Sequence, residues 1–170
     1  MPSDRRKQRK IRSALFNEPW LIDDRYMVEM IDTLEDGVQA NIEDEQPKTL
    51  MQNGTAIISL RGVTRRNVDS TVRFFGGTST RQLEKDFQAA IADPNVSQIV
   101  LLIDSPGGEA RGTEEAAQVI YDARGKKPIT SMIDGLAASA AYYMGSSADR
   151  VVATPSSMIG SIGTIYIHGE

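Results

Sequence analysis

The chain contains 170 residues, of which 40% are hydrophobic and 25% charged, a composition typical of one globular domain with enough apolar material for a core. Because it has no cysteine and a single histidine, disulfide frameworks, thiolate nucleophiles and Cys-based zinc sites are excluded, and we expect no cofactor. The net charge of -4 gives no general case for nucleic-acid binding. No apolar run approaches the roughly 20 residues of a membrane-spanning helix, and no apolar segment follows the basic N-terminus, so we expect a cytoplasmic protein without a signal peptide or membrane anchor.

Residues 1–52 differ from the rest of the chain in composition and charge pattern, and we interpret them as an N-terminal extension. Basic side chains crowd its start and acidic side chains dominate the stretch that follows, which is typical of a solvated arm, with docking to an acidic partner as the alternative. Apolar residues at i, i+3, i+4 and i+7 predict a short amphipathic helix over residues 24–34, ended near Gly37. Residues 41–52 have the composition of a polar linker. A folded domain is expected over residues 53–170.

From residue 53 onward, strand and helix signals alternate. The predicted elements are a strand over 55–63, a loop over 68–80, a helix that Pro94 ends, a strand over 96–103, a helix over 113–124, a strand over 129–133, a helix over 138–147 and a strand over 150–153. The strand over 96–103 is almost continuously apolar, as expected of a strand buried on both faces of a parallel sheet. The alternation predicts an α/β fold.

The segment Asp-Ser-Pro-Gly-Gly at residues 104–108 follows directly on the buried strand. It therefore lies at the carboxyl end of a parallel strand, where α/β sheets place their ligands. Gly107 and Gly108 leave backbone N–H groups uncovered, so an extended peptide or a developing oxyanion can approach them. The competing interpretation is an ordinary Pro-Gly turn between a strand and a helix.

Ser139 follows the next strand and a glycine turn, near the start of an alanine-rich helix. The N–H of Ala140 can point toward the oxyanion that would develop on a carbonyl group attacked by the serine hydroxyl. Taken alone, this segment is equally typical of a helix start built from small residues for tight packing. Together with Gly107 and Gly108, however, it supplies a nucleophile and oxyanion donors from two separate turns, which is what acyl transfer needs.

The general base is less evident. His168 is the obvious candidate, but it stands two residues from the end of the chain. Lys126 and Lys127 begin the strand whose far end leads to Ser139, and the residues between Lys127 and Asp134 would span about 23 Å if extended. A lysine side chain cannot cover that distance, so we expect the base of Ser139 to lie outside residues 54–165.

Three segments, at residues 104–108, 135–143 and 153–163, resemble in order and spacing the motifs of the S49 peptidases, the family of signal peptide peptidase A and its phage relatives. The resemblance implies a Clp-protease/crotonase-like spiral of ββα units. It also implies a serine–lysine dyad in which Ser139 is the nucleophile and Gly107, Gly108 and Ala140 form the oxyanion hole. Ser161 is similar to the hydroxyl that orients the lysine, with a turn serine as the equal alternative.

In the family, the lysine lies about fifty residues beyond the serine, whereas this chain ends at Glu170. We therefore expect the spiral to be incomplete at its C-terminus and the chain by itself to be inactive. Residues 13–22, followed by a short helix, resemble the start of the phage prohead proteases of S49 type. That resemblance implies cleavage of scaffold or portal proteins during capsid maturation, in the host cytoplasm or the prohead. We also expect a homo-oligomer, no nucleic-acid partner and no membrane anchor.

Other functions remain open at this point. One is a non-catalytic subunit of capsid assembly that keeps the fold but lacks the base, and another is a cellular protease like the signal peptide peptidases. A Clp-type Ser-His-Asp protease would use His168. An acyl-CoA-binding protein of crotonase type would need the paired oxyanion amides but no nucleophilic serine.

Overall fold

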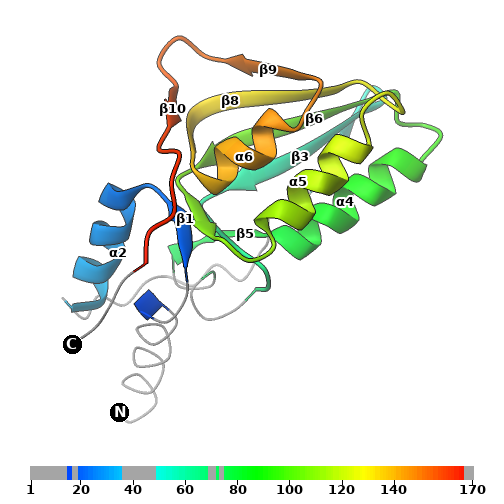
Figure 1. Cartoon of the computed structure of the whole chain (residues 1–170). Helices are drawn as coiled ribbons and strands as arrows, with labels where there is room; N and C mark the ends of the chain where they lie inside the picture. The colour runs from blue at the N-terminus through cyan, green and yellow to red at the C-terminus, as the bar shows by residue number, and fades with distance from the viewer. Residues whose placement is uncertain (1–14, 17–18, 36–48, 69–71, 73–74, 167–170) are drawn as a thin grey trace.

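The computed structural model describes residues 15–16, 19–35, 49–68, 72 and 75–166. Two sheets organise this part of the chain, one of long strands and one of short strands, and three helices lie along one face of the larger sheet (Figure 1). The prediction of an α/β fold is confirmed. Among the described residues, no helix combines the length and the apolar character needed to cross a bilayer.

The larger sheet has the strand order β10-β8-β6-β3-β2, and β9 also pairs with β8. Its pairings are parallel, except that β2 runs antiparallel to β3. The strands are β2 (Leu50–Gln52), β3 (Thr55–Arg61), β6 (Gln98–Ser105), β8 (Ile129–Ala138), β9 (Arg150–Ala153) and β10 (Met158–Gly160). Parallel neighbours require crossover connections, which the helices supply.

The smaller sheet has the order β1-β7-β4-β5 and consists of strands of three residues. These strands are β1 (Trp20–Ile22), β4 (Val63–Arg65), β5 (Gly77–Ser79) and β7 (Gly107–Glu109). A long strand, a short strand and a helix follow one another twice along the chain, as β3, β4 and α4 and again as β6, β7 and α5, with β5 inserted before α4. This repetition is the expected spiral of ββα units.

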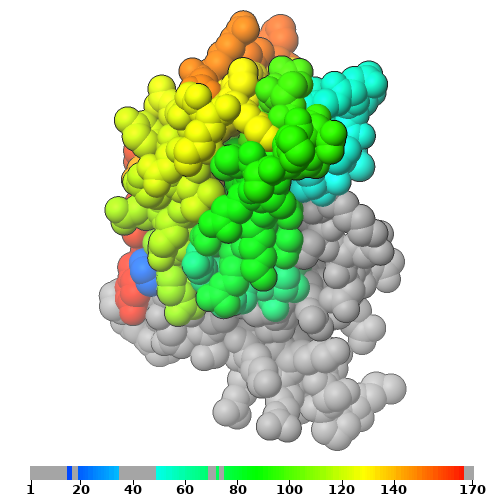
Figure 2. All heavy atoms as spheres, turned by 90° about the vertical axis from the view of Figure 1, so that its right-hand side faces the viewer, coloured from blue at the N-terminus to red at the C-terminus, as the bar shows by residue number. Residues whose placement is uncertain are grey.

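The helices α4 (Thr80–Ala92), α5 (Thr113–Asp122) and α6 (Ala140–Ser146) build the main core against one face of the larger sheet. Figure 2 shows α4 in green and α5 in yellow-green, side by side. Helix α4 begins where the hydroxyl of Ser79 accepts a hydrogen bond from the N–H of Gln82, a standard N-cap. Its side chains Leu83 and Phe87 are buried in the core.

Burial of β6 differs from the prediction. Ile99, Leu101 and Ile103 are fully buried, but Val100 and Leu102 on the other face are partly exposed. The helices of the described residues cover only one face of the sheet (Figure 1). An apolar run therefore did not mean burial on both faces here, because periodicity cannot tell which face receives the helices.

Several short strands also differ from the prediction. Residues 50–52 form β2 rather than the end of a polar linker, and residues 77–79 form β5 within the predicted loop. The strand predicted over 129–133 continues to Ala138, and β10 was not predicted. Strands of three residues are specified by their neighbours in the sheet, so local propensity does not reveal them.

The N-terminal segment is part of the fold where it is described. The predicted helix is confirmed as α2 (Asp24–Glu35). Trp20 and Ile22 of β1 are buried in a second apolar cluster with Met27 and Met30. The basic arm over residues 1–12 lies outside the described residues, and the domain boundary at residue 52 stays a prediction, although β1 and β2 pair with strands beyond it.

Candidate active site

Ser139 stands at the sharp turn between β8 and α6. Its backbone has φ 49° and ψ -111°, a conformation that side-chain-bearing residues rarely adopt. Such a conformation costs on the order of 1–3 kcal/mol and persists only where the surrounding structure imposes it, which is common at functional sites. The residue is only 4% exposed. The turn thus holds one serine in a fixed, strained position at the end of the central strand.

A loop after β10 covers the serine. The Ser139 hydroxyl donates a hydrogen bond to the carbonyl oxygen of Gly163 at 3.0 Å, and the Ser139 N–H donates to the carbonyl of Gly160 at 3.0 Å. At the other end of the residue, its carbonyl accepts the N–H of Tyr143 in the first turn of α6. These contacts fix both the backbone and the side chain of the serine.

The two predicted oxyanion turns meet in space. A Cβ built on Gly107 would lie 3.0 Å from the amide nitrogen of Ala140 and 2.9 Å from the carbonyl oxygen of Ala138, and it would overlap the carbonyl oxygen of Leu21. Gly107 has φ +94°, so both its conformation and its surroundings require glycine. The geometry therefore agrees with the expectation that Gly107 lies beside the start of α6.

Gly108 is equally constrained, by a different neighbour. A Cβ there would overlap the carbonyl oxygen of Thr64 in β4 and lie 2.5 Å from the amide nitrogen of the same residue. The two glycines let the short strand β7 pass between β1 and β4, which pair with it on opposite edges.

Sequence reasoning missed the role of Ser105 in this turn. Its hydroxyl donates to the carbonyl of Gly62 at 2.6 Å and accepts the N–H of Gly107 at 3.2 Å. The Gly107 amide is thus engaged within the turn. Gly108 stands opposite Leu21 in the antiparallel pairing of β7 with β1, so its amide also lies within a strand pairing. Ser105 lies inside the Asp-Ser-Pro-Gly-Gly segment, and its position there could have indicated this role from the sequence.

A groove of about 350 Å³ opens beside the serine turn. It is lined by backbone and side chains of the β8 end, of β10 with the loop after it, and of the segment after β1, namely Leu136, Ala138, Met158, Ile159, Gly160, Ser161, Asp23 and Arg25. Ser161 has φ 51°, a second strained serine close to the first. The predicted orienting residue thus borders the groove next to Ser139.

Charge at the groove comes from Asp23 and Arg25. The Asp23 carboxylate accepts both side-chain N–H groups of Arg25, from Nε and Nη2, at 3.1 Å. The side-chain hydrogen bond from Arg25 lowers the pKa of Asp23 below its usual 3.8 and outweighs desolvation, while the same bond raises the pKa of Arg25. Burial raises the pKa of Tyr26. Within the described residues, no group of three or more His, Cys, Asp or Glu side chains is placed to hold a metal ion.

Because the folded-state pKa of Asp23 is lowered, its ionised form adds stability above the unfolded pKa, and this stability is lost as the pH falls through the folded value. We expect Asp23→Asn, which keeps a side-chain oxygen that can accept the Arg25 backbone N–H at the start of α2, to cause a small loss in the free energy of unfolding at pH 7. That difference should disappear in acid. Urea unfolding of both proteins from pH 7 to pH 2 measures it, and Arg25→Gln should reproduce the profile. A difference in the free energy of unfolding that does not change with pH would contradict a stabilising role for the ionised Asp23 carboxylate.

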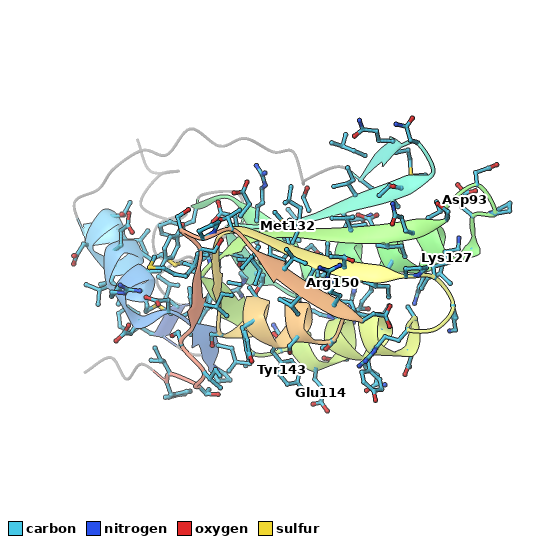
Figure 3. All side chains as sticks on the ribbon, turned by 90° about the horizontal axis from the view of Figure 1, so that it is seen from above. Asp93, Glu114, Lys127, Met132, Tyr143 and Arg150 are labelled. Atoms are coloured by element: carbon cyan, nitrogen blue, oxygen red, sulfur yellow. The ribbon has the colours of Figure 1, made fainter. Side chains whose placement is uncertain are left out.

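Lys127, one of the candidate bases, is bonded to another part of the fold. Lys127 donates from Nζ to the carbonyl oxygens of Ala90 and Asp93, at 2.7 and 2.5 Å. Figure 3 shows Lys127 and Asp93 together at one end of the sheet. This lysine caps the carbonyl groups at the end of α4. Its position agrees with the earlier conclusion that Lys127 is too far along the strand to be the base of Ser139. His168 lies outside the described residues.

Comparison with known proteins points to a family whose sequence profile covers the serine turn. The sequence profile of peptidase family S49 matches residues 122–169, which include Ser139, Ala140 and Ser161. The head-tail preconnector protein GP5 of Enterobacteria phage P21 is 35% identical over 116 residues, covering 68% of this chain and 23% of that protein. The capsid assembly protease C of Escherichia phage lambda is 28% identical over 120 residues, covering 71% of this chain and 27% of that protein. The chain is related to the S49 peptidases.

This chain spans about a quarter of the length of those two phage relatives. Among solved structures, the crystal structure of an enoyl-CoA hydratase/isomerase family member is similar with a TM-score of 0.54 at 16% identity, covering 66% of this chain and 49% of that chain. At this identity the likeness shows the fold alone. The S49 relationship and the crotonase-like architecture are therefore both confirmed, by independent comparisons.

Proposed function

We propose that this chain carries the nucleophile half of a serine endopeptidase of S49 type. The observation that carries the proposal is the meeting of the strained Ser139 turn with the Gly107-Gly108 turn, so that Gly107 lies against the Ala140 amide. Acyl transfer needs a fixed nucleophile with N–H donors beside it, and this arrangement offers both from rigid elements. A binding protein of crotonase type would not need the strained serine.

In the proposed reaction, the Ser139 hydroxyl oxygen attacks the carbonyl carbon of a peptide bond while its proton passes to a base. The amides of the Gly107-Gly108 turn and of Ala140 stabilise the oxyanion that forms. The C–N bond then breaks, the departing amine takes the proton, and water later hydrolyses the acyl-enzyme. We assign the base to a lysine outside residues 1–170, and Ser161 to its orientation.

The proposed substrates are scaffold or portal proteins of a phage capsid. The support is that the lambda relative is a capsid assembly protease, together with the 35% identity to a phage head-tail preconnector protein. The proposed place of action is the host cytoplasm or the prohead, in a homo-oligomer.

Covalent labelling tests the proposal directly. A fluorophosphonate should modify Ser139, located by peptide mapping, in a protein extended by its natural downstream reading frame. The chain of residues 1–170 should stay unlabelled for lack of a base. Ser139→Ala in the extended protein is the control. Absence of label in the extended protein, with the fold intact by circular dichroism, would reject the peptidase assignment.

A further inference from the structure

Strand β1 lies between two other chain segments next to the serine turn. On one edge it pairs antiparallel with β7, with Leu21 opposite Gly108 and Ile22 opposite Gly107. On the other edge Trp20 exchanges two backbone hydrogen bonds with Ile165, at 2.7 and 2.8 Å. In Figure 1, β1 stands in blue beside the red segment that follows β10. The N-terminal segment is thus the middle strand of a three-segment pairing.

The carbonyl group of Leu21 lies at the candidate oxyanion site. A Cβ built on Gly107 would overlap the Leu21 carbonyl oxygen and lie 3.0 Å from the Ala140 amide nitrogen, so both groups border the same glycine. The ladder continues on both sides of this residue, because Ala110 N–H donates to the Pro19 carbonyl at 3.1 Å and Asp23 N–H donates to the Pro106 carbonyl at 2.8 Å. An extended chain with one carbonyl among the proposed oxyanion donors is the geometry a peptide substrate needs.

We propose that residues 19–23 are an internal ligand. They occupy a second groove, the peptide-binding groove between β7 and the segment around Ile165, and must leave it before another peptide can bind. The proposal rests on the proposed function for the role of Ser139. It also names the class of ligand. The groove takes an extended peptide that pairs antiparallel with β7 and places an aliphatic residue, as Leu21 is here, opposite Gly108.

Side chains outside the groove hold this segment in place. The Trp20 side chain is fully buried, donates from Nε1 to the Leu15 carbonyl at 3.0 Å, and has the Arg65 guanidinium 5.1 Å from its ring centroid. Ile22 is buried in the same cluster. These contacts favour the occupied state, so a free peptide competes with a tethered strand at high effective concentration.

The test is peptide binding to the full chain with β1 released or locked. The probe is a fluorescent peptide of residues 19–23, Pro-Trp-Leu-Ile-Asp, measured by polarisation. Leu21→Pro removes the central N–H of β1 and should tighten binding at least tenfold over wild type. Met51→Pro in β2, another short antiparallel edge strand away from the groove, is the matched control and should change nothing.

Locking uses the absence of natural cysteine in the chain. Pro19 and Ala110 are antiparallel partners, and the Cα separation of such pairs, about 5.5 Å, suits a disulfide. Oxidised Pro19→Cys/Ala110→Cys should lose at least tenfold in peptide affinity, and reduction should restore it. Leu50→Cys/Ile57→Cys, which locks β2 to β3, should bind equally in both redox states.

Equal binding by the oxidised and reduced forms of the groove disulfide would overturn the proposal, as would a Leu21→Pro protein that binds no better than Met51→Pro. If Leu21→Pro does not fold, the disulfide pair still decides. All measurements are repeated with Ser139→Ala, since binding needs no catalysis. Peptide capture, combined with no labelling of Ser139 in the protein extended by its downstream reading frame, would reject the proposed function and keep the inference. Labelling of Ser139 in that extended protein without the redox effect on peptide binding would reject the inference and keep the proposed function.

Discussion

In the protein extended by its downstream reading frame, Ser139→Ala is expected to reduce cleavage of the proposed scaffold or portal substrates by about 10⁴-fold or more, because removing the nucleophile leaves only binding and oxyanion stabilisation. The fold should survive. Alanine keeps the same strained backbone and loses one hydrogen bond, to Gly163, a change worth about 1 kcal/mol. Processing is followed on gels of co-expressed proteins, and stability by urea unfolding.

Ser146→Ala is the matched control for this experiment. Ser146 ends α6, the helix that Ser139 precedes, and its hydroxyl is exposed and donates to the carbonyl of Tyr143. The variant should cleave at the wild-type rate. If Ser139→Ala cleaves as well as Ser146→Ala does, the serine is not the nucleophile, and the non-catalytic subunit becomes the better assignment.

The second large effect concerns the glycine turn. Gly108→Ala is expected to lower the free energy of unfolding by about 3 kcal/mol or more, because the added Cβ meets backbone atoms of Thr64, which cannot move without separating β4 from β7. If the protein still folds, the displaced amide should also lower the rate of Ser139 labelling.

Two other glycines calibrate this result. Gly76 has φ +74° but nothing within 4 Å of an added Cβ, so Gly76→Ala should cost only about 1–2 kcal/mol for the left-handed conformation. Gly163→Ala, which meets neither a neighbour nor a positive φ, should be nearly neutral. Urea unfolding ranks the three. A Gly108→Ala protein as stable as Gly76→Ala would mean that the approach of β4 to β7 is not tight.

The long elements and the place of the serine were well predicted. Periodic apolar residues located α2, α4 and α5 to within a few residues, and the apolar runs located β3, β6 and the first half of β8. These elements are long enough for their own residues to express a period. The segment at residues 104–108 was correctly placed at the end of a strand, and so was Ser139, since a run of small residues after an apolar strand has a local meaning. The predicted glycine turn before Ser139 was wrong, because Gly135 lies within β8.

The short strands could not be predicted in the same way. Strand β7 contains two glycines and a glutamate, and β10 is Met-Ile-Gly, so neither carries an alternating pattern. Burial of β6 was overestimated because the sequence does not say which face the helices cover. The base of Ser139 also stayed open, since the position expected for the lysine from the S49 resemblance lies beyond residue 170 and His168 lies outside the described residues.

By itself, the sequence determined the order of the long strands and helices, the serine that is the candidate nucleophile, and the S49 relationship, because periodicity and motifs are local properties of the chain. Only the tertiary structure brought Gly107 against Ala140 and laid β1 along β7 beside them. The physical reason is that strand pairing uses backbone N–H and C=O groups, which nearly every residue carries. The side chains of residues 19–23 therefore show no pattern that would predict the position of this segment in the proposed peptide-binding groove between β7 and Ile165.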